Sequence, residues 1–337
     1  MRPMTGMALA PLPAATSITP DRDRPRRRTR RTRGEAISAG DRVGAWRIDA
    51  ELGRGGMAAV YAVTHHRFGK RAALKLCHAA ILRQGFTAET FLREARIVHR
   101  VDHPGVCDVF ATGTHRGLPY LAMERLAGET LGARLERGPL PRVDALELLI
   151  EVCDVLAAAH AAGVVHRDLK LDNVFVLEAP GAGGRRTKLL DWGVARILGE
   201  PDPMRDMIAG TLAYVAPEQI RGEELAPAAD VYSLAVLAYE VLLGEPPFAS
   251  RSDYDLLRMH LGAAPPAPMQ LWPEIPTELA ATLLAMLAKD PAQRPPVTEV
   301  RRALDLVRAR LVPARAGSPR AWMHHLHCWL GRLALIL

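Results

Sequence analysis

Two short polar motifs are the most informative feature of this sequence. Residues 166–173 read His-Arg-Asp-Leu-Lys-Leu-Asp-Asn, and residues 191–193, which begin eighteen positions after Asn173, read Asp-Trp-Gly. Asp168 can accept a proton from an attacking hydroxyl group. Asn173 and Asp191 carry hard oxygen ligands of the kind that Mg²⁺ prefers. The two motifs therefore predict a site for metal-dependent phosphoryl transfer, built from two loops.

A glycine-rich segment at 53–60 reads Gly-Arg-Gly-Gly-Met-Ala-Ala-Val. Glycine lets backbone N–H groups approach phosphate oxygens that a Cβ atom would keep away. The pattern also fits the dinucleotide-binding turn of an oxidoreductase, which requires a helix straight after the glycines. Residues 60–63 instead continue as a predicted strand, and Lys75 lies on the strand after that. The segment is therefore interpreted as a glycine-rich hairpin followed by a strand lysine.

Lys75 and Glu94 are expected to form an ion pair. Lys75 lies on an otherwise apolar strand, 72–76, where an unpaired ammonium group would be costly. Glu94 lies on the following predicted helix and is the expected partner, with Glu89 as a competing acid. The alternative is a surface lysine and a solvated glutamate.

The hydrophobic pattern divides the chain into a β-rich part and a helical part. Short apolar runs predict strands at 46–52, 59–63, 72–76, 106–113 and 120–124. Apolar residues at three- and four-residue spacing predict a helix at 90–100 and another that runs from about Val143 and ends at Gly163. The same spacing predicts helices at 230–243, 253–261, 276–288 and 297–311.

Together these motifs resemble the protein kinase family, in particular the bacterial serine/threonine kinases of eukaryotic type. The resemblance runs from about Val43 to Leu311. It implies an α+β, bilobal fold, with a small β-rich N-terminal lobe at about 41–126 that carries one main helix. A larger helical C-terminal lobe would follow at about 127–312. It also implies ATP-dependent transfer of the γ-phosphoryl group to a Ser or Thr hydroxyl of a protein substrate, in signalling, with Mg²⁺ or alternatively Mn²⁺.

The resemblance assigns roles to individual residues. The implied catalytic residues are Lys75, Glu94, Asp168, Lys170, Asn173, Asp191 and Thr211, and the implied metal ligands are Asn173 and Asp191. The implied nucleotide-binding residues are Leu52, Gly53, Arg54, Gly55, Gly56, Met57, Ala58, Val60, Ala73, Lys75, Met123, Glu124, Leu126 and Phe175. Residues 123–126 would connect the lobes, with backbone groups free to bind an adenine edge. Because Ala58 stands where the family usually has a third glycine, we expect a slightly stiffer loop without loss of function.

Three further residues are expected to brace the loop of residues 166–173, called the catalytic loop from here on, or the segment of residues 191–218. Glu218 is expected to pair with Arg294, and Asp230 is expected to hold the catalytic loop from a buried helix start. These residues are expected to act through folding and loop geometry.

Trp192 departs from the phenylalanine that the family usually has between Asp191 and Gly193. The larger indole must pack against His166 and the helix of Glu94, and its N–H group requires a partner. The hypothesis is that this ring disfavours flipping of the segment. Trp192 and Ala58 are also the support for an alternative, a pseudokinase-type nucleotide-binding scaffold without catalysis.

The segment between Trp192 and Gly210 contains no Ser, Thr or Tyr, although Arg167 precedes the proposed base. In related kinases an arginine at this position commonly pairs with a phosphorylated residue. The acids available here are Glu200, Asp202 and Asp206. We expect one of them to replace the phosphate. The alternative is an exposed ion pair that contributes about 0–1 kcal/mol.

Composition and charge narrow the class of protein. The sequence has 337 residues, of which 49% are hydrophobic, enough for a substantial core. Its net charge is +7, but residues 1–40 carry nine Arg against three acids, so this arm contributes +6 and the remainder +1. No nucleic-acid partner is therefore expected for the folded body.

The two ends are expected to lie outside the folded domain, which is assigned to 41–312. Residues 1–40 predict a disordered basic arm. Residues 313–337 predict a tail with an amphipathic helix, which gives weak support for membrane contact. With no signal sequence apparent and four widely spaced cysteines, the expected location is the cytoplasm, with a peripheral membrane location as the alternative.

Overall fold

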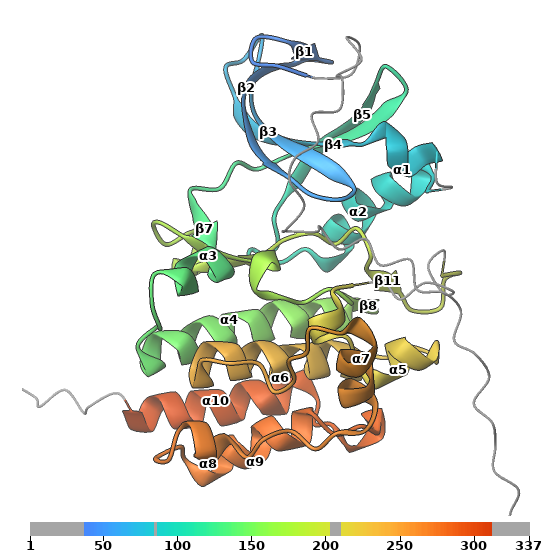
Figure 1. The fold of residues 1–337 in the computed structure, drawn as a ribbon. Helices are drawn as coiled ribbons and strands as arrows, with labels where there is room; N and C mark the ends of the chain where they lie inside the picture. The colour runs from blue at the N-terminus through green and yellow to red at the C-terminus, as the bar shows by residue number, and fades with distance from the viewer. Residues whose placement is uncertain (1–36, 84–85, 203–209, 312–337) are drawn as a thin grey trace, which may run out of the picture.

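The folded part of the chain has two lobes of different character, which Figure 1 shows one above the other. The computed structural model describes residues 37–83, 86–202 and 210–311. A β-sheet with two helices forms the N-terminal lobe, and a stack of helices with a few short strands forms the C-terminal lobe. The predicted α+β, bilobal architecture is confirmed.

One antiparallel sheet builds the N-terminal lobe, in the strand order β1-β2-β3-β4-β6-β5. The strands are β1 Arg42–Val43, β2 Trp46–Arg54, β3 Ala58–His65, β4 Arg71–Cys77, β5 Val109–His115 and β6 Leu118–Met123. The register places Lys75 of β4 opposite Val60 of β3 and Leu121 of β6. Lys75 therefore lies next to the strand that leaves the glycine-rich turn.

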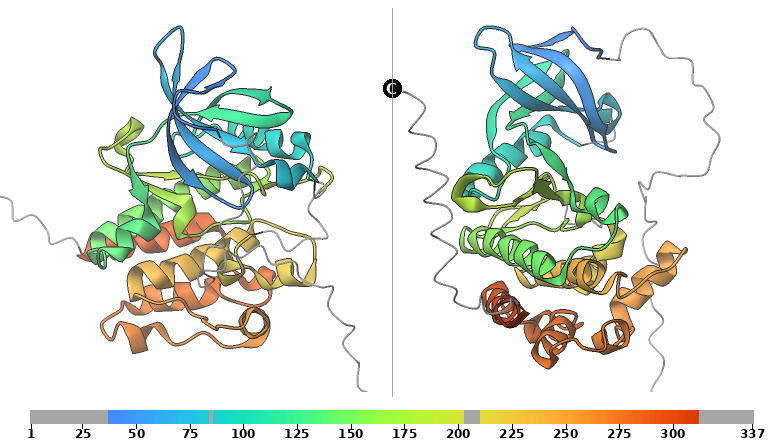
Figure 2. Two further views of the ribbon diagram at one scale, coloured as in Figure 1. Left: turned by 45° about the horizontal axis from the view of Figure 1, so that its top comes forward. Right: turned by 90° about the vertical axis from the view of Figure 1, so that its left-hand side faces the viewer.

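Helix α2 (Ala88–Val101) carries Glu94 toward the sheet, and the short helix α1 (Ala79–Arg83) precedes it. Thr87 caps α2, because its Oγ1 atom accepts a hydrogen bond from the backbone N–H of Thr90 at 3.1 Å. The helix is strongly amphipathic, and Glu94 lies among its buried residues. Figure 2 shows α2 between the sheet and the helical lobe, in agreement with its contacts to β6 and α4.

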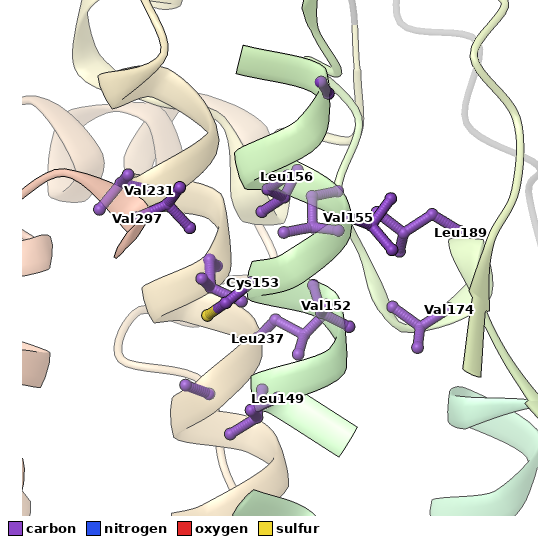
Figure 3. Close-up of a cluster of buried hydrophobic side chains, with 14 of the residues drawn as sticks. Leu149, Val152, Cys153, Val155, Leu156, Val174, Leu189, Val231, Leu237 and Val297 are labelled. Carbon is purple, nitrogen blue, oxygen red and sulfur yellow. The ribbon is translucent and has the colours of Figure 1, made fainter. Parts of the chain in front are cut away.

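The helices of the C-terminal lobe pack around two apolar helices, α4 and α6. The helices are α3 Leu131–Glu136, α4 Arg142–Ala161, α5 Pro217–Arg221, α6 Ala228–Leu243, α7 Asp253–Gly262, α8 Pro268–Leu271, α9 Thr277–Met286 and α10 Val297–Leu311. Nearly all of α6 is buried, as expected for a helix within a lobe. α4 buries its apolar residues and keeps an acidic side, where Glu147 pairs with Arg308 and Asp154 with Arg301. Figure 3 shows this core, where Leu149, Val152 and Leu156 of α4 pack near Leu237 of α6 and Val174 and Leu189 of two short strands.

Five short strands hold the loops that carry the polar motifs. They are β7 Gly128–Thr130, β8 Val164–Val165, β9 Val174–Leu177, β10 Thr187–Leu189 and β11 Arg196–Ile197. β8 pairs with β11, and β9 pairs with both β7 and β10. Loop 166–173 therefore runs from β8 to β9, and the loop of residues 190–195 runs from β10 to β11. Both loops are anchored at both ends.

The predicted elements of five residues or more are confirmed, with shifts of a few residues at their ends. The predicted start of one strand was wrong, because β5 begins at Val109 and not at Val106. Val106 instead forms an isolated parallel bridge with Leu189, and the N–H of Cys107 bonds to the carbonyl of Leu189 at 3.3 Å. This stretch is thus tied to the C-terminal lobe before the strand begins.

Most of the expected basic arm (1–40) and the expected tail (313–337) lie outside the described residues. The end of the arm was placed too late, because Ile37 packs against the core of the N-terminal lobe and Gly40 donates to the carbonyl of Ile48 at 2.9 Å. Within the described part, no helix combines the length and apolar character needed to span a bilayer. The three described cysteines, Cys77, Cys107 and Cys153, are buried free thiols.

Candidate active site

Asp230, at the start of α6, fixes the backbone of the catalytic loop. Its fully buried carboxylate accepts hydrogen bonds from the N–H groups of His166 at 2.8 Å and Arg167 at 2.9 Å. His160 of α4 lies 2.9 Å from the same carboxylate. Burial opposes the charge on Asp230, but the bonds from His160 and the loop outweigh it, so the pKa of Asp230 lies below its ordinary value. The predicted bracing role of Asp230 is confirmed.

Asp168 lies at the centre of a compact polar cluster. Its Oδ1 atom accepts hydrogen bonds from the backbone N–H of Thr211 at 2.8 Å and from the Thr211 hydroxyl at 3.0 Å. Its Oδ2 atom lies 3.0 Å from the side-chain nitrogens of both Asn173 and Lys170. Lys170 also donates to the Thr211 hydroxyl at 2.7 Å. Three residues predicted as catalytic therefore meet at the carboxylate of a fourth, Asp168.

A second cluster joins the N-terminal lobe to the loop of residues 190–195. The ammonium of Lys75 lies 2.8 Å from Glu94 and 2.7 Å from Asp191, so the predicted Lys75–Glu94 pair is confirmed. Burial opposes ionisation of Asp191, but the nearby Lys75 charge prevails, and the pKa of Asp191 falls to about 2. Burial likewise opposes the charge on Lys75, whose pKa is nonetheless raised by its two carboxylate partners.

Backbone bonds bring the two clusters together. The N–H of Leu190 donates to the carbonyl of Asn173 at 2.8 Å, immediately before Asp191. Arg167 and Asp191 both adopt the left-handed region, with φ of 69° and 57°. Such conformations are uncommon for residues other than glycine, are strained, and occur often at functional sites.

Asn173 and Asp191 offer a suitable pair of metal ligands. The Asn173 side-chain nitrogen bonds to Asp168, which leaves its amide oxygen as the remaining ligand atom. Lys75 contacts Oδ1 of Asp191. Across the described ranges no group of three or more His, Cys, Asp or Glu side chains could hold a metal ion. A two-residue site fits Mg²⁺, which in phosphoryl-transfer sites takes one or two protein ligands together with substrate phosphates.

The glycine-rich segment forms the turn between β2 and β3, as predicted, and no helix follows it. The alternative interpretation, the dinucleotide-binding turn of an oxidoreductase, is therefore excluded. A Cβ built at Gly53 would meet no atom within 4 Å, and one at Gly55 would meet only the Ala58 carbonyl at 3.8 Å. Neither glycine has a positive φ. Because the chain's own packing does not demand glycine here, close approach of a ligand is the remaining physical reason.

The connector between the lobes differs from the prediction at Glu124. Its backbone N–H is engaged by the carbonyl of Asp108 at 2.9 Å, and its side chain pairs with Lys188. Its carbonyl accepts a weak bond from the Cys107 thiol at 3.8 Å. The Glu124 amide is thus not free for adenine, and the expectation of free backbone groups stays a prediction for Leu126.

The remaining residues predicted to bind nucleotide lie around the same region. Leu52, Arg54, Met57, Ala58, Val60, Ala73 and Met123 belong to β2–β4, their turn and β6, and Phe175 belongs to β9. Arg54 is held by Glu51 at 2.8 Å, which points to a role within the hairpin. Ala58 is buried in the core, as its methyl group allows.

Trp192 is packed as the sequence predicted. Its side chain is 1% exposed, and its ring lies 4.5 Å from that of His166 in an edge-to-face arrangement. The expected partner for its indole N–H is missing, since Nε1 is buried without a hydrogen bond among the described residues. The ring is therefore held by packing alone.

We expect Trp192 to keep Asp191 facing Lys75 even without nucleotide, because turning the segment would expose a large ring from a close-packed site. Nucleotide-free crystal forms of the wild type should show this inward Asp191, whereas Trp192→Phe should show flipped segments more often. A flipped Asp191 in most wild-type forms would contradict the hypothesis.

Arg167 pairs with Asp202, one of the three acids expected near it, and Asp206 lies outside the described residues. Glu200 lies instead 3.7 Å from Arg93 and 3.5 Å from Arg100, both on α2. The sequence reasoning missed these two arginines. Their spacing of seven residues, which places both on one face of a helix, was the available signal.

Glu218 and Arg294 form the predicted ion pair, fully buried within the C-terminal lobe. The contacts are bidentate, at 2.6 and 2.8 Å, and the two side chains are 2% and 0% exposed. Arg294 also donates to the carbonyls of Ala228 at 2.9 Å and Ala288 at 2.8 Å. The pair therefore ties α5 to the start of α6 and to the segment between α9 and α10.

Replacing Arg294 with alanine should lower the free energy of unfolding by about 3–5 kcal/mol, because it leaves the Glu218 carboxylate buried and unpaired. Urea unfolding monitored by circular dichroism measures this change. Arg310→Ala is the matched control, since its partner Glu278 lies on the surface, and it should leave stability nearly unchanged. Equal stability of the two variants would contradict the bracing role.

Comparisons with known proteins establish the family. Residues 46–303 match the family described as Protein kinase domain. The chain therefore belongs to the protein kinase family, and the resemblance found in its motifs is confirmed.

The chain is similar to named bacterial kinases. It is 37% identical over 284 residues to serine/threonine-protein kinase Pkn1 of Myxococcus xanthus, which covers 83% of this chain and 41% of that protein. It is 34% identical over 264 residues to serine/threonine-protein kinase PknB of Mycobacterium leprae, with coverage of 76% and 42%. The chain thus spans about two fifths of the length of these relatives.

A solved structure shares the fold. The PknI kinase domain of Mycobacterium tuberculosis matches with a TM-score of 0.63 and 27% identity, covering 80% of this chain and 99% of that one.

Proposed function

We propose that this chain is an ATP-dependent protein kinase that phosphorylates Ser or Thr hydroxyl groups of a protein substrate. The observation that carries the proposal is the meeting of Lys170, Asn173 and Thr211 at Asp168, beside the Lys75–Glu94–Asp191 cluster. The family and its named bacterial serine/threonine kinases support the same activity.

In the proposed reaction, Asp168 orients the acceptor hydroxyl and accepts its proton. The bond between the γ-phosphorus and its bridging oxygen breaks as the hydroxyl oxygen bonds to phosphorus, and ADP leaves. Lys170, 3.0 Å from Asp168, offsets the negative charge that develops on the transferred group. Lys75, held by Glu94, positions the α- and β-phosphates.

Asn173 and Asp191 are proposed to hold Mg²⁺, with Mn²⁺ as an alternative ion. When bound, the ion neutralises charge on the phosphate oxygens. The charges of the second cluster favour a cation, since two carboxylates there face one ammonium group. Asp191, with its pKa of about 2, remains ionised at neutral pH and available as a ligand.

The proposal includes a kinase domain that spans residues 41–312, approximately. It also includes protein substrates that carry the acceptor hydroxyl. Thr211 contacts both Asp168 and Lys170, so its side chain occupies the space beside the proposed base. This arrangement supports a Ser or Thr acceptor. A scaffold without catalysis is less well supported, since each chemical group that the reaction requires is present.

The test is incubation of the purified protein with labelled ATP, Mg²⁺ and a generic basic protein, followed by analysis of the phosphorylated amino acids. The proposal expects label on Ser or Thr that depends on the metal ion. ATP binding without transfer to any protein, under conditions where a related kinase is active, would favour the scaffold.

A further inference from the structure

Arg167 is a buried cation, and among the described residues one carboxylate, that of Asp202, pairs with it. Its Nη1 atom donates to Oδ1 of Asp202 at 3.1 Å, and its Nη2 atom contacts Oδ2. The side chains of Arg167 and Asp202 are 2% and 8% exposed. A bidentate pair with this burial is far from the weak surface contact that was the alternative.

The backbone of Arg167 is fixed independently of this pair. Its N–H donates to Asp230, its carbonyl accepts from the Gln219 side chain at 3.3 Å, and its φ is 69°. The Arg167 side chain is therefore a fixed anchor beside Asp168. Whatever anion it binds will be held in place relative to the catalytic loop.

The segment that carries Asp202 leaves β11 alongside that loop. Leu198 donates its N–H to the carbonyl of Gly163 at 2.8 Å, directly after the β8–β11 pairing. Glu200 then lies near Arg93 and Arg100 of α2. Burial lowers the pKa of Arg93, and the charges of Glu200 and Asp202 oppose that shift. Of the two acids, Glu200 is the one that contacts the helix that carries Glu94.

No phosphorylatable residue can perform this role in the segment. Residues 193–209 contain no Ser, Thr or Tyr. Thr211, the next hydroxyl, is bonded to Asp168 and Lys170, so a phosphate there would sit against the proposed base.

We propose that Asp202 is a built-in positioning residue that neutralises Arg167 and fixes the segment after β11 beside the catalytic loop, so that activity requires no phosphorylation of this segment. The inference rests on the proposed kinase activity and specifies its regulation. Asp202 acts through Arg167 and touches no reacting atom.

The test compares Asp202→Asn, Asp202→Glu and the wild type with ATP and a peptide substrate. Asp202→Asn should lower kcat by roughly 10²-fold, the scale expected when reacting groups are misplaced by about 1 Å. The Kd for ATP should change little, because Lys75 and the glycine-rich turn are untouched. Asp202→Glu should recover most of the rate, since it restores the carboxylate.

Two controls separate positioning from general damage. Glu224→Gln removes an exposed acid that pairs with Arg196 at 3.4 Å, and it should leave kcat unchanged. Adding Arg167→Gln to Asp202→Asn should cause little further loss, because residues that act as a pair are not additive. A double variant much slower than either single variant would contradict action through Arg167.

The wild type itself provides a test that does not depend on the variants folding. After phosphatase treatment, with mass spectrometry showing no phosphate on residues 193–211, it should phosphorylate the peptide at full rate and without a lag. A wild type that requires phosphorylation of Thr211 would overturn the inference, as would an Asp202→Asn variant with unchanged kcat. A wild type with no transfer at all would instead overturn the proposed function.

Discussion

Replacing Asp168 with alanine should lower kcat for phosphoryl transfer by roughly 10²–10⁴-fold while ATP binding is largely kept. The carboxylate is the meeting point of Lys170, Asn173 and Thr211, at distances of 2.8–3.0 Å. Its removal takes away both the proton acceptor and the group that orients its neighbours. Steady-state rates with a peptide substrate and calorimetric titration with ATP measure the two quantities separately.

Asp168→Asn is the matched variant, because it keeps the shape and the two hydrogen bonds that Thr211 donates, but it cannot accept a proton. We expect it to be nearly as slow as alanine while unfolding at a temperature closer to the wild type. If the asparagine variant retained a wild-type rate, the assignment of Asp168 as the base would be wrong.

Replacing Lys75 with methionine should lower kcat/KM for ATP by roughly 10²–10³-fold, the loss seen when one preorganised electrostatic group is removed from a site. Lys75 lies 2.8 Å from Glu94 and 2.7 Å from Asp191. Methionine retains the length of the side chain but leaves two carboxylates facing each other without a cation. Repulsion between them should move α2 away from the loop of residues 190–195.

Lys70→Met is the control for this change. Lys70 belongs to the same lobe, but its ammonium lies 3.4 Å from the ring centroid of Phe110 and not at the polar cluster. Its replacement should leave kcat/KM unchanged. Adding Glu94→Gln to Lys75→Met should relieve the repulsion and raise thermal stability without restoring the rate. Equal kinetics for the Lys70 and Lys75 variants would contradict the phosphate-positioning role.

Much of the fold could be predicted because its long elements carry strong local patterns. Helices such as α2 and α10 are amphipathic, and their predicted ranges agree closely with the observed ones. The two-residue strands β8 and β11 could not be predicted in this way. They exist because distant segments pair with each other, and two residues carry no periodicity.

The contacts of the candidate site were likewise predictable in part. The Lys75–Glu94 pair was predictable because Lys75 stood on an apolar strand that demanded a partner, whereas the Glu218–Arg294 pair followed from the resemblance to the protein kinase family. The engagement of the Glu124 amide by Asp108 was not, since backbone bonds between non-adjacent loops leave no mark on side-chain types. The buried Trp192 N–H was likewise hidden, because only the packed structure shows which polar atoms lack a partner.

The central claim is that residues from both lobes converge on a nucleotide triphosphate, and a crystal structure with Mg²⁺ and a non-hydrolysable ATP analogue tests it most directly. The account predicts Lys75 on the α- and β-phosphates, Asn173 and Asp191 on the metal ion, and Asp168 facing the terminal phosphoryl group. An analogue bound elsewhere, or one whose phosphates contact none of these four side chains, would contradict it.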